Sequence, residues 1–238
     1  MMRAAGLERY QRLPVAAEVF DDTVRALGAA GFRGANVTIP HKRAALALAT
    51  TASDAAREIG AANTLTFGAD GLIAADNTDA PGLLDALGSP PASALVLGAG
   101  GSARAVIWAL TQAGADVAVW NRTPERAQGL GARIVEHPVA AEVLVNCTSV
   151  GLDDLSNPFK DLPLDADGLD TYTTVIDLVY RSGGTALVSE AERRGVSIID
   201  GLEILVRQGA LSFEIWTGKP APLDAMRAAA RGDGGGRG

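Results

Sequence analysis

Two kinds of hydrophobic pattern alternate along the chain. Short apolar runs of strand length occur at 33–39, 64–67, 72–76, 94–97, 116–120, 142–146, 174–178 and 196–199. Segments with apolar residues at helical spacing follow many of them, at 42–51, 81–87, 104–112, 185–194, 202–216 and 223–231. Alternating strands and helices are typical of a parallel sheet with helices on both faces. The pattern therefore predicts an α/β protein.

Turn-forming residues divide this pattern into two domains. Gly68 to Gly71 separates two strands with the chemistry of a hairpin turn. The stretch 88–91, Gly-Ser-Pro-Pro, has the composition of a linker, and the strand–turn–helix pattern begins again at Ala94. We expect a first domain over 1–87, a second over 88–201, and terminal helices in 202–231 that return to the first. The Gly-rich end, 232–238, is predicted to be disordered.

Composition disfavours some classes of binding partner and some cellular compartments. The 238 residues carry a net charge of −7, which disfavours nucleic acid and anionic membrane surfaces as partners. A single cysteine, Cys147, forms no internal disulfide and leaves no Cys-based zinc site. Residues 1–11 lack the apolar core of a signal peptide, and no apolar run approaches the length of a membrane span. We expect a cytoplasmic protein with a small-molecule ligand.

A glycine-rich turn predicts a dinucleotide site. The strand that ends at Leu97 enters Gly98-Ala99-Gly100-Gly101-Ser102-Ala103, a G-x-G-x-x-A sequence that opens a helical segment. Gly98 suits the tight turn, Gly100 allows the backbone to approach a pyrophosphate, and Ala103 lets the helix pack on the strand. A structural turn is the simpler alternative, but the second strand that follows at 116–120 favours dinucleotide binding.

The end of that second strand favours NADP over NAD. NAD-binding chains place a carboxylate there for the ribose hydroxyls, whereas this chain has Asn121-Arg122-Thr123. The Arg122 guanidinium suits a 2′-phosphate. The alternative is that Arg122 is a solvated loop charge and that Thr123 only caps a helix beginning at Pro124.

A further turn follows a later strand. Asn146, Thr148 and Ser149 stand at the carboxyl end of the strand over 142–146, where ligands of open α/β sheets bind. These residues are predicted to line the cofactor, although a plain turn is an equal alternative.

An enzyme that uses a nicotinamide cofactor on an alcohol or carbonyl needs a group that exchanges a proton with the reacting oxygen. His41 and His137 lack metal-ligand spacing, so no metal site is predicted, and no Tyr-x-x-x-Lys pair occurs. Lys42 remains, in a chain with 18 Arg and three Lys. Arginine does not exchange protons at neutral pH, so a lysine at this strand-to-helix junction is a candidate.

Polar residues at other junctions of the first domain accompany Lys42. They are Asn36, Thr38, Asn63 and the run Asp76-Asn77-Thr78-Asp79. The run is either a helix cap before Pro81 or part of a site for a polyhydroxylated substrate.

Taken together, these residues resemble the shikimate dehydrogenase family over about 4–222. The motifs are G-A-N-V-T-I-P-H-K at 34–42, I-G-A-A-N-T at 59–64, D-N-T-D-A-P-G at 76–82, G-A-G-G-S-A at 98–103, N-R-T at 121–123, N-C-T-S-V-G at 146–151, D-L-V-Y at 177–180 and G-L-E-I-L-V-R-Q-G-A at 201–210. Their agreement in order is far more specific than any one of them.

The resemblance implies an NADP-dependent oxidoreductase of the shikimate pathway, which leads to chorismate and the aromatic amino acids. It implies a substrate-binding domain over 1–87 with 202–231, a Rossmann-type NADP domain over 88–201, and an active site in the cleft between them. The residues that it implies are Lys42 and Asp79 as the catalytic pair, Thr38, Asn63, Asp79 and Gln208 at the substrate hydroxyls, Tyr180 near the substrate carboxylate, and Gly201 facing the nicotinamide.

One departure from the family opens alternatives. The family normally begins with a strand and a Ser-x-Ser-Pro segment, whose serines hold the substrate carboxylate. Here Ala4-Ala5-Gly6-Leu7 stands almost at the first residue, so we expect that segment to be missing and the first domain to be incomplete. The alternatives are a quinate/shikimate-type dehydrogenase and a catalytically impaired NADP-binding module. A monomer or a homodimer is expected.

Overall fold

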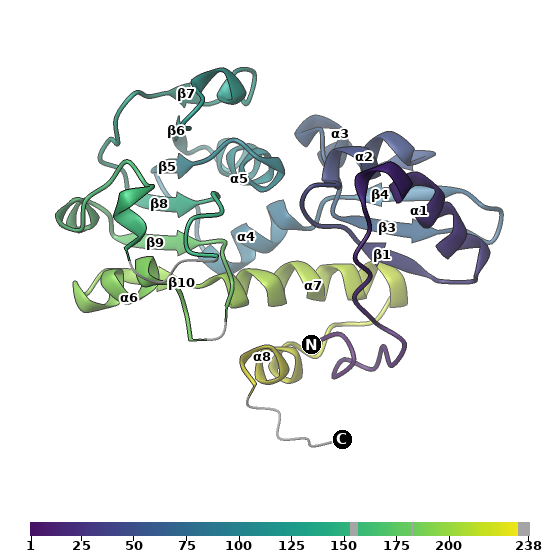
Figure 1. Ribbon diagram of the computed structural model, residues 1–238. Helices are drawn as coiled ribbons and strands as arrows, with labels where there is room; N and C mark the ends of the chain where they lie inside the picture. The colour runs from purple at the N-terminus through teal and green to yellow at the C-terminus, as the bar shows by residue number, and fades with distance from the viewer. Residues whose placement is uncertain (153–156, 182, 233–238) are drawn as a thin grey trace. The chain divides into compact units, whose positions relative to one another are not determined.

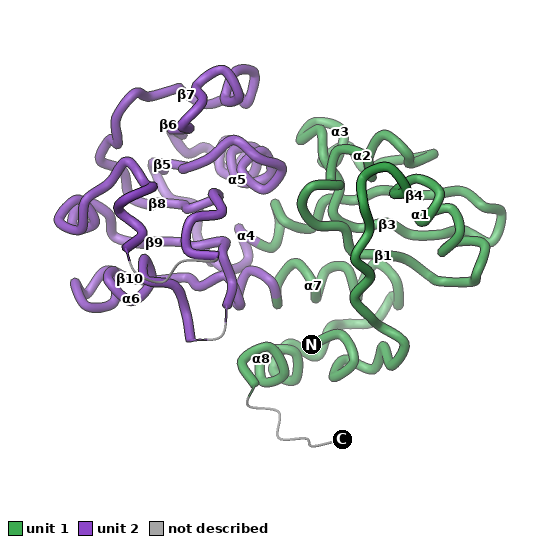
Figure 2. Tube along the Cα trace, viewed as in Figure 1, with its two compact units in different colours: residues 1–82, 206–238 green, residues 83–205 purple. Residues whose placement is uncertain are grey.

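The structure is a computed structural model that describes residues 1–152, 157–181 and 183–232, and it divides into two compact units (Figure 2). Unit 1 comprises Met1–Gly82 and Val206–Gly238, and unit 2 comprises Leu83–Leu205. The divisions fall inside helices α4 (Asp79–Leu87) and α7 (Gly201–Thr217). Apart from Gly232, the tail predicted to be disordered lies outside the described residues.

Unit 2 is built on a six-stranded sheet in the order β10-β9-β8-β5-β6-β7 (Figure 1). Its strands are β5 (Ser93–Leu97), β6 (Asp116–Trp120), β7 (Arg133–Ile134), β8 (Val143–Asn146), β9 (Thr174–Asp177) and β10 (Ser197–Ile199). Every pairing in this sheet is parallel. The chain leaves β5 toward β6 and later returns to β8 on the other side, which makes the β5/β8 boundary the topological switch point.

Helices and an apolar core stabilise this sheet. Helix α5 (Gly101–Gln112) packs on β5 and β6, and α6 (Ala186–Arg193) packs on β9 and β10. The central strands are almost wholly apolar because both of their faces are covered. Three short 3₁₀ turns complete the described part of the unit, η2 (Pro124–Ala127), η3 (Pro158–Lys160) and η4 (Asp167–Thr171).

Unit 1 contains a mixed four-stranded sheet in the order β1-β3-β4-β2. The strands are β1 (Gly34–Asn36), β2 (Thr51–Ala52), β3 (Thr64–Phe67) and β4 (Ile73–Asp76). β3 and β4 form the predicted antiparallel hairpin across Gly68 to Gly71. The turn η1 (Ala17–Val19) and the helices α1 (Phe20–Ala29), α2 (Lys42–Leu48) and α3 (Asp54–Ile59) complete this part of the unit. Phe20, Val24, Val37 and Leu65 belong to its buried core.

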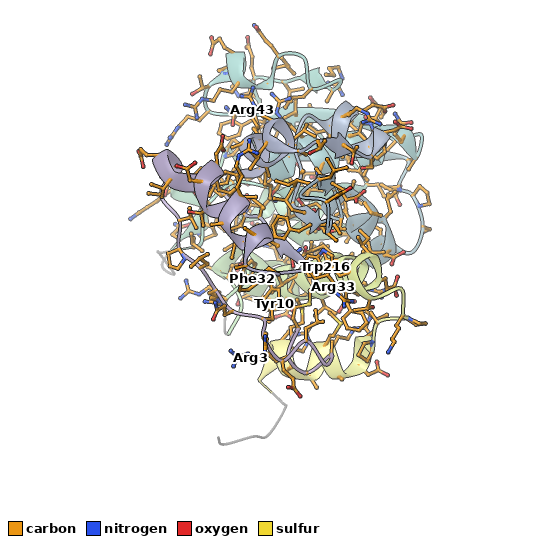
Figure 3. The ribbon with its side chains drawn as sticks, turned by 90° about the vertical axis from the view of Figure 1, so that its right-hand side faces the viewer. Arg3, Tyr10, Phe32, Arg33, Arg43 and Trp216 are labelled. Atoms are coloured by element: carbon orange, nitrogen blue, oxygen red, sulfur yellow. The ribbon has the colours of Figure 1, made fainter. Side chains whose placement is uncertain are left out.

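The C-terminal helices pack on unit 1. Met2, Val206, Phe213, Trp216 and Met226 form a buried cluster that joins the second half of α7, α8 (Leu223–Arg231) and the first residues of the chain. The Trp216 Nε1 donates to the Leu65 carbonyl oxygen at 3.0 Å. Arg33, which lies beside Trp216 in Figure 3, donates to the Trp216 carbonyl oxygen at 3.0 Å. These bonds fix α7 against β3.

The predicted fold class is confirmed, with helices alternating with strands and the terminal helices returning to the first unit. The strand expected over 33–39 is shorter, at Gly34–Asn36, although the Val37 N–H still donates to the Asn63 carbonyl oxygen in the same register. The structure adds α1, α3, β2 and β7, which the hydrophobic pattern does not predict. The alternative in which Thr123 only caps a helix is not supported, because η2 is a 3₁₀ turn and Thr123 makes no side-chain capping bond. No described helix has the length and apolar character needed to span a bilayer.

Gly34 is expected to be indispensable for docking α7. A Cβ at Gly34 would overlap the Trp216 indole nitrogen and the Leu65 carbonyl oxygen, whereas one at Gly28 in α1 would make ordinary contacts of 3.6 Å with Phe67. Gly34→Ala should lower the free energy of unfolding by about 3 kcal/mol through overpacking and loss of the indole hydrogen bond. Gly28→Ala should keep or raise it. Urea unfolding of both variants measures the difference, and equal midpoints would contradict the docking.

Candidate active site

Lys42 begins α2 and is held close to a carboxylate. Its Nζ lies 2.8 Å from the Asp79 Oδ2, and the two side chains are only 10% and 15% exposed. The preceding residue, His41, is fixed by stacking of its ring on Phe20, with centroids 4.5 Å apart, and by a 2.8 Å contact between its Nε2 and the Val15 carbonyl oxygen. The start of α2 is therefore anchored, and Lys42 is held at the Asp79 carboxylate.

Asp79 stands at the beginning of α4. The Asn77 Oδ1 accepts from the backbone N–H of Asp79 at 3.1 Å and of Ala80 at 3.3 Å, and the Asn77 Nδ2 donates to the Ala61 carbonyl oxygen at 3.0 Å. Asn77 is therefore the helix cap, which leaves the Asp79 carboxylate for Lys42. The positive end of the helix dipole also favours a carboxylate at this position. The cap interpretation of the run at 76–79 is confirmed for Asn77, and the site interpretation stays a prediction for Asp79.

Asn63 connects this ion pair to the sheet. Its Oδ1 accepts from the Thr78 N–H at 2.7 Å, and a backbone N–H only donates, so the orientation of the amide is determined. The Nδ2 then donates to the Asp79 Oδ1 at 2.8 Å. It also lies 3.3 Å from the Gln208 Oε1. Lys42, Asp79, Asn63 and Gln208, four of the expected site residues, therefore form one connected cluster.

A layer of buried hydroxyl groups lies behind Asn63. The Ser212 Oγ, fully buried on α7, is 2.8 Å from the Thr64 Oγ1 and 3.2 Å from the Thr78 Oγ1. It accepts from the Asn36 Nδ2 at 2.8 Å and donates to the Gln208 carbonyl oxygen at 3.0 Å. These bonds tie β1, β3, α4 and α7 together at the level of the ion pair.

The other expected substrate residues lie on other segments of the chain. Thr38 is exposed in the segment between β1 and α2. Tyr180 belongs to unit 2 and is 46% exposed. Gly201 begins α7 in unit 2, where a Cβ would lie 2.6 Å from the Val179 carbonyl oxygen, so a larger residue is excluded there.

The glycine-rich turn has the geometry that a dinucleotide needs. Gly98 has φ +105°, a conformation that favours glycine, and its N–H donates to the Trp120 carbonyl oxygen at 2.8 Å. A Cβ at Gly100 would meet no atom within 4 Å, and the N-terminus of α5 has no side-chain cap. Ala103 is fully buried, as expected for close packing of α5 on the sheet. The N–H groups at the start of α5 thus border a space suited to a phosphate.

A pocket of about 330 Å³ lies in the same unit. It is lined by Trp120, Asn121, Arg122, Thr123, Arg126, Thr148, Ser149, Val150, Gly151, Asn157, Pro158 and Asp161. Two guanidinium groups and several hydroxyl and amide groups therefore face a single cavity. This donor set suits a phosphate ester next to a flat ring. Asn121, Arg122, Thr123, Thr148 and Ser149 were expected here from the sequence.

Sequence reasoning missed two residues of these clusters. Arg126 lines the pocket and stands four residues after Arg122, and Ser212 stands four residues after Gln208 on α7. A spacing of four places side chains on one face of a helix, which was the available signal for Ser212. For Arg126 the same spacing was a weaker signal, because η2 is a short 3₁₀ turn.

Metal ligands do not gather in the described part of the chain. No group of three or more His, Cys, Asp or Glu side chains that could hold a metal ion occurs among the described residues.

Family models and curated relatives that match this chain carry the name shikimate dehydrogenase. The family model for the shikimate dehydrogenase substrate binding domain matches residues 1–65, and that for the shikimate 5'-dehydrogenase C-terminal domain matches 201–231. A shikimate dehydrogenase (NADP(+)) of Roseobacter denitrificans is 44% identical over 94% of this chain and 87% of its own length. One from a strain of Thermus thermophilus is 47% identical over 84% of this chain and 78% of its own length.

The same relationship appears among solved structures. A shikimate 5-dehydrogenase of Thermus thermophilus, crystallised in complex with NADP(H) and shikimate, superposes with a TM-score of 0.84 at 40% identity. The match covers 97% of this chain and 92% of that one.

Ser212 is expected to contribute to stability through its buried bonds. Ser212→Ala leaves the Asn36 Nδ2 without its 2.8 Å acceptor and should lower the free energy of unfolding by about 1–3 kcal/mol. Ser197→Ala, at an exposed position of β10, is the matched control and should change it by less than about 0.5 kcal/mol. Urea unfolding checks both variants. Equal unfolding midpoints would show that the hydroxyl layer does not stabilise unit 1.

Proposed function

The chain belongs to the shikimate dehydrogenase family, and from this premise we infer that it interconverts 3-dehydroshikimate and shikimate with NADP, using Lys42 and Asp79 as the catalytic pair. In the reducing direction, a carbonyl group of the substrate gains a hydride at its carbon from NADPH and a proton at its oxygen, and becomes an alcohol. Oxidation of the alcohol by NADP reverses both transfers. The observation that carries the catalytic assignment is the buried 2.8 Å ion pair between the Lys42 Nζ and the Asp79 Oδ2.

Lys42 is assigned the proton transfer. In the reducing direction its ammonium donates a proton to the carbonyl oxygen, and in the oxidising direction its amine takes that proton from the hydroxyl group. Asp79 holds the Nζ in place while Asn63 holds the second carboxylate oxygen, at 2.8 Å in each case. NADPH supplies the hydride, and NADP accepts it in reverse.

Substrate hydroxyl groups are assigned to the residues around this pair. The Gln208 Oε1 faces the Asn63 Nδ2 at 3.3 Å, so the Gln208 Nε2 is the atom that we assign to a substrate hydroxyl. Asn63, Asp79 and the exposed Thr38 complete this set, and Tyr180 is assigned to the carboxylate. The hydroxyl layer behind Asn63 supports the proposal because it limits the freedom of these groups before substrate arrives.

The cofactor is assigned to unit 2. Residues 98–103 and the N-terminus of α5 suit the pyrophosphate, and Arg122 with Arg126 suits the 2′-phosphate. Asn121, Thr123, Asn146, Thr148 and Ser149 complete the proposed contacts, with Gly201 at the nicotinamide. We assign substrate binding to 1–87 with 202–231, and cofactor binding to 88–201. Neither a quinate-type enzyme nor an inactive NADP-binding module is favoured by a specific observation.

Turnover tests the function directly. Purified protein incubated with shikimate and NADP should produce NADPH, and NADP should raise the melting temperature in parallel. Stabilisation by NADP without turnover would overturn the enzymatic assignment and leave the cofactor assignment intact.

Lys42→Ala tests the assigned proton transfer. The variant should lose about 100- to 10,000-fold in kcat, because the acid–base group is removed. Its affinity for NADP should remain nearly unchanged, because Lys42 lies in unit 1 and the cofactor residues lie in unit 2. Lys219→Ala, at an exposed position between α7 and α8, is the control with unchanged kcat. A Lys42→Ala variant with the original rate would sink the mechanism.

Arg122 and Arg126 are expected to determine the preference for NADP. Arg122→Ala should weaken NADP binding about 10- to 100-fold while NAD binding stays constant, because only NADP carries the 2′-phosphate. Arg126→Ala should act in the same direction, and the double variant should bind the two cofactors alike. Arg133→Ala, on β7 outside the pocket, is the control. Isothermal titration with both cofactors measures these affinities, and a parallel loss for NAD would contradict the assignment.

A further inference from the structure

Asp177 is a buried carboxylate outside the proposed contacts. It ends β9 and is fully buried. Its Oδ1 accepts from the Asn146 Nδ2 at 2.9 Å and from the Val179 N–H at 3.1 Å, and its Oδ2 accepts from the Thr185 Oγ1 at 2.6 Å. An amide, a backbone N–H and a hydroxyl thus all donate to this carboxylate. We call these four residues the Asp177 cluster.

The Asn146 amide and the Val179 N–H both require an acceptor at position 177. Burial raises the pKa of Asp177, and the hydrogen bonds from Thr185, Val179 and Asn146 offset only part of that rise. Asparagine can keep an oxygen for Asn146 and Val179 and turn its NH₂ group to the Thr185 hydroxyl, because a hydroxyl also accepts. A side chain without oxygen, as in Asp177→Leu, leaves the Asn146 amide without this acceptor.

Asn146 connects the Asp177 cluster to the turn over 148–150, because its amide bonds to both. Its Oδ1 accepts from the Thr148 N–H at 3.1 Å and from the Thr148 Oγ1 at 2.7 Å. The Thr148 Oγ1 in turn accepts from the Val150 N–H at 3.1 Å. The Asn146 amide cannot rotate to suit a changed residue 177 without presenting its NH₂ group to the Thr148 N–H. The orientation set at Asp177 therefore determines the conformation of residues 148–150.

These residues form one side of the nucleotide pocket. Thr148, Ser149, Val150 and Gly151 line it, and they follow β8, the strand next to β5 at the switch point. The Thr148 Cγ2 also lies 3.3 Å from where a Cβ of Gly98 would stand, so the turn after β8 abuts the glycine-rich turn.

We propose that Asp177 is a positioning residue for the cofactor, acting through Asn146 to fix the 148–151 side of the nucleotide pocket. Asp177 itself is fully buried and needs no contact with the nucleotide. The proposal rests on the assignment of this pocket to NADP, and it adds a residue from β9 that sets the affinity of that site.

Thr185 provides a matched control for a purely structural role. It donates to the other carboxylate oxygen and caps α6 by accepting from the Val188 N–H at 3.2 Å. Thr185→Val removes both bonds but leaves the path from Asp177 through Asn146 to Thr148. Asp177→Leu also removes the acceptor of the Asn146 amide, so we expect only this substitution to disturb the pocket.

The test combines nucleotide binding with amide exchange. Asp177→Leu should weaken binding of NADP and of adenosine 2′,5′-bisphosphate about tenfold or more, with kcat at saturating NADP within about twofold of the wild type. Thr185→Val should lower the melting temperature but keep both affinities within about twofold, and Asp177→Asn, which keeps an acceptor oxygen, should also keep them. Without any nucleotide, the Thr148 and Val150 amides should exchange faster with solvent in Asp177→Leu, and unchanged in Thr185→Val.

Other outcomes would overturn either the role of Asp177 or the assignment of the pocket to NADP. Unchanged affinity and unchanged exchange in a folded Asp177→Leu variant overturn the proposal, as does an equal loss of affinity in Thr185→Val. If Asp177→Leu does not fold, Asn146→Ala takes its place and should reproduce the faster Val150 exchange. Absence of NADP binding by the wild-type protein overturns the assignment of the pocket, whereas the exchange measurements still decide whether Asp177 fixes residues 148–150.

Discussion

Lys42 and Asp79 are both nearly buried, so the free-energy cost of removing their charges from water must be offset by nearby hydrogen bonds. Much of unit 1 is arranged to provide these bonds. The ion pair alone does not repay the desolvation of two charges, so the remaining carboxylate oxygen needs its own donor. Asn63 supplies this donor, and its orientation is fixed by the Thr78 N–H. The Thr64 and Ser212 hydroxyls surround that amide. The proposed catalytic geometry is thus determined by hydrogen bonds within the fold, before any substrate binds.

The described part of unit 2 contains a single buried carboxyl group, Asp177, that also needs hydrogen-bond donors around it. Asp177 has donors on both oxygens, and those donors belong to the ends of β8 and β9 and to the N-terminus of α6. Parallel strands bring their carboxyl ends to one edge of the sheet, so a single carboxylate there can connect three loops. Hydrogen bonding around a charge therefore orders the loops in unit 2, as it orders the ion pair in unit 1.

The sequence predicts the frame of both units better than the connections within the sites. Long, buried strands such as β5 and β6, and the β3–β4 hairpin, have clear apolar patterns and turn residues. Two-residue strands such as β2 and β7 have no pattern of their own, because the neighbouring strand determines them. Elimination and the family motifs point to Lys42 and Asp79, whereas the bond between Ser212 and Asn36, 176 residues apart, follows only from the packing of α7 on β1. Contacts between distant segments require the tertiary fold.

In the proposed function, arginine binds phosphate and lysine transfers a proton. The chemistry of the two side chains explains this division. Arginine remains charged at all relevant pH values and offers a planar set of donors, which suits the constant charge of a phosphate at Arg122 and Arg126. Lysine can gain and lose its proton, which suits a position where the reaction itself moves one. Of the three Lys, all in the described part of the chain, Lys42 is the one that lies buried against a carboxylate, that of Asp79. In the proposed mechanism, the lysine at position 42 therefore serves proton transfer, which a permanently charged arginine does not.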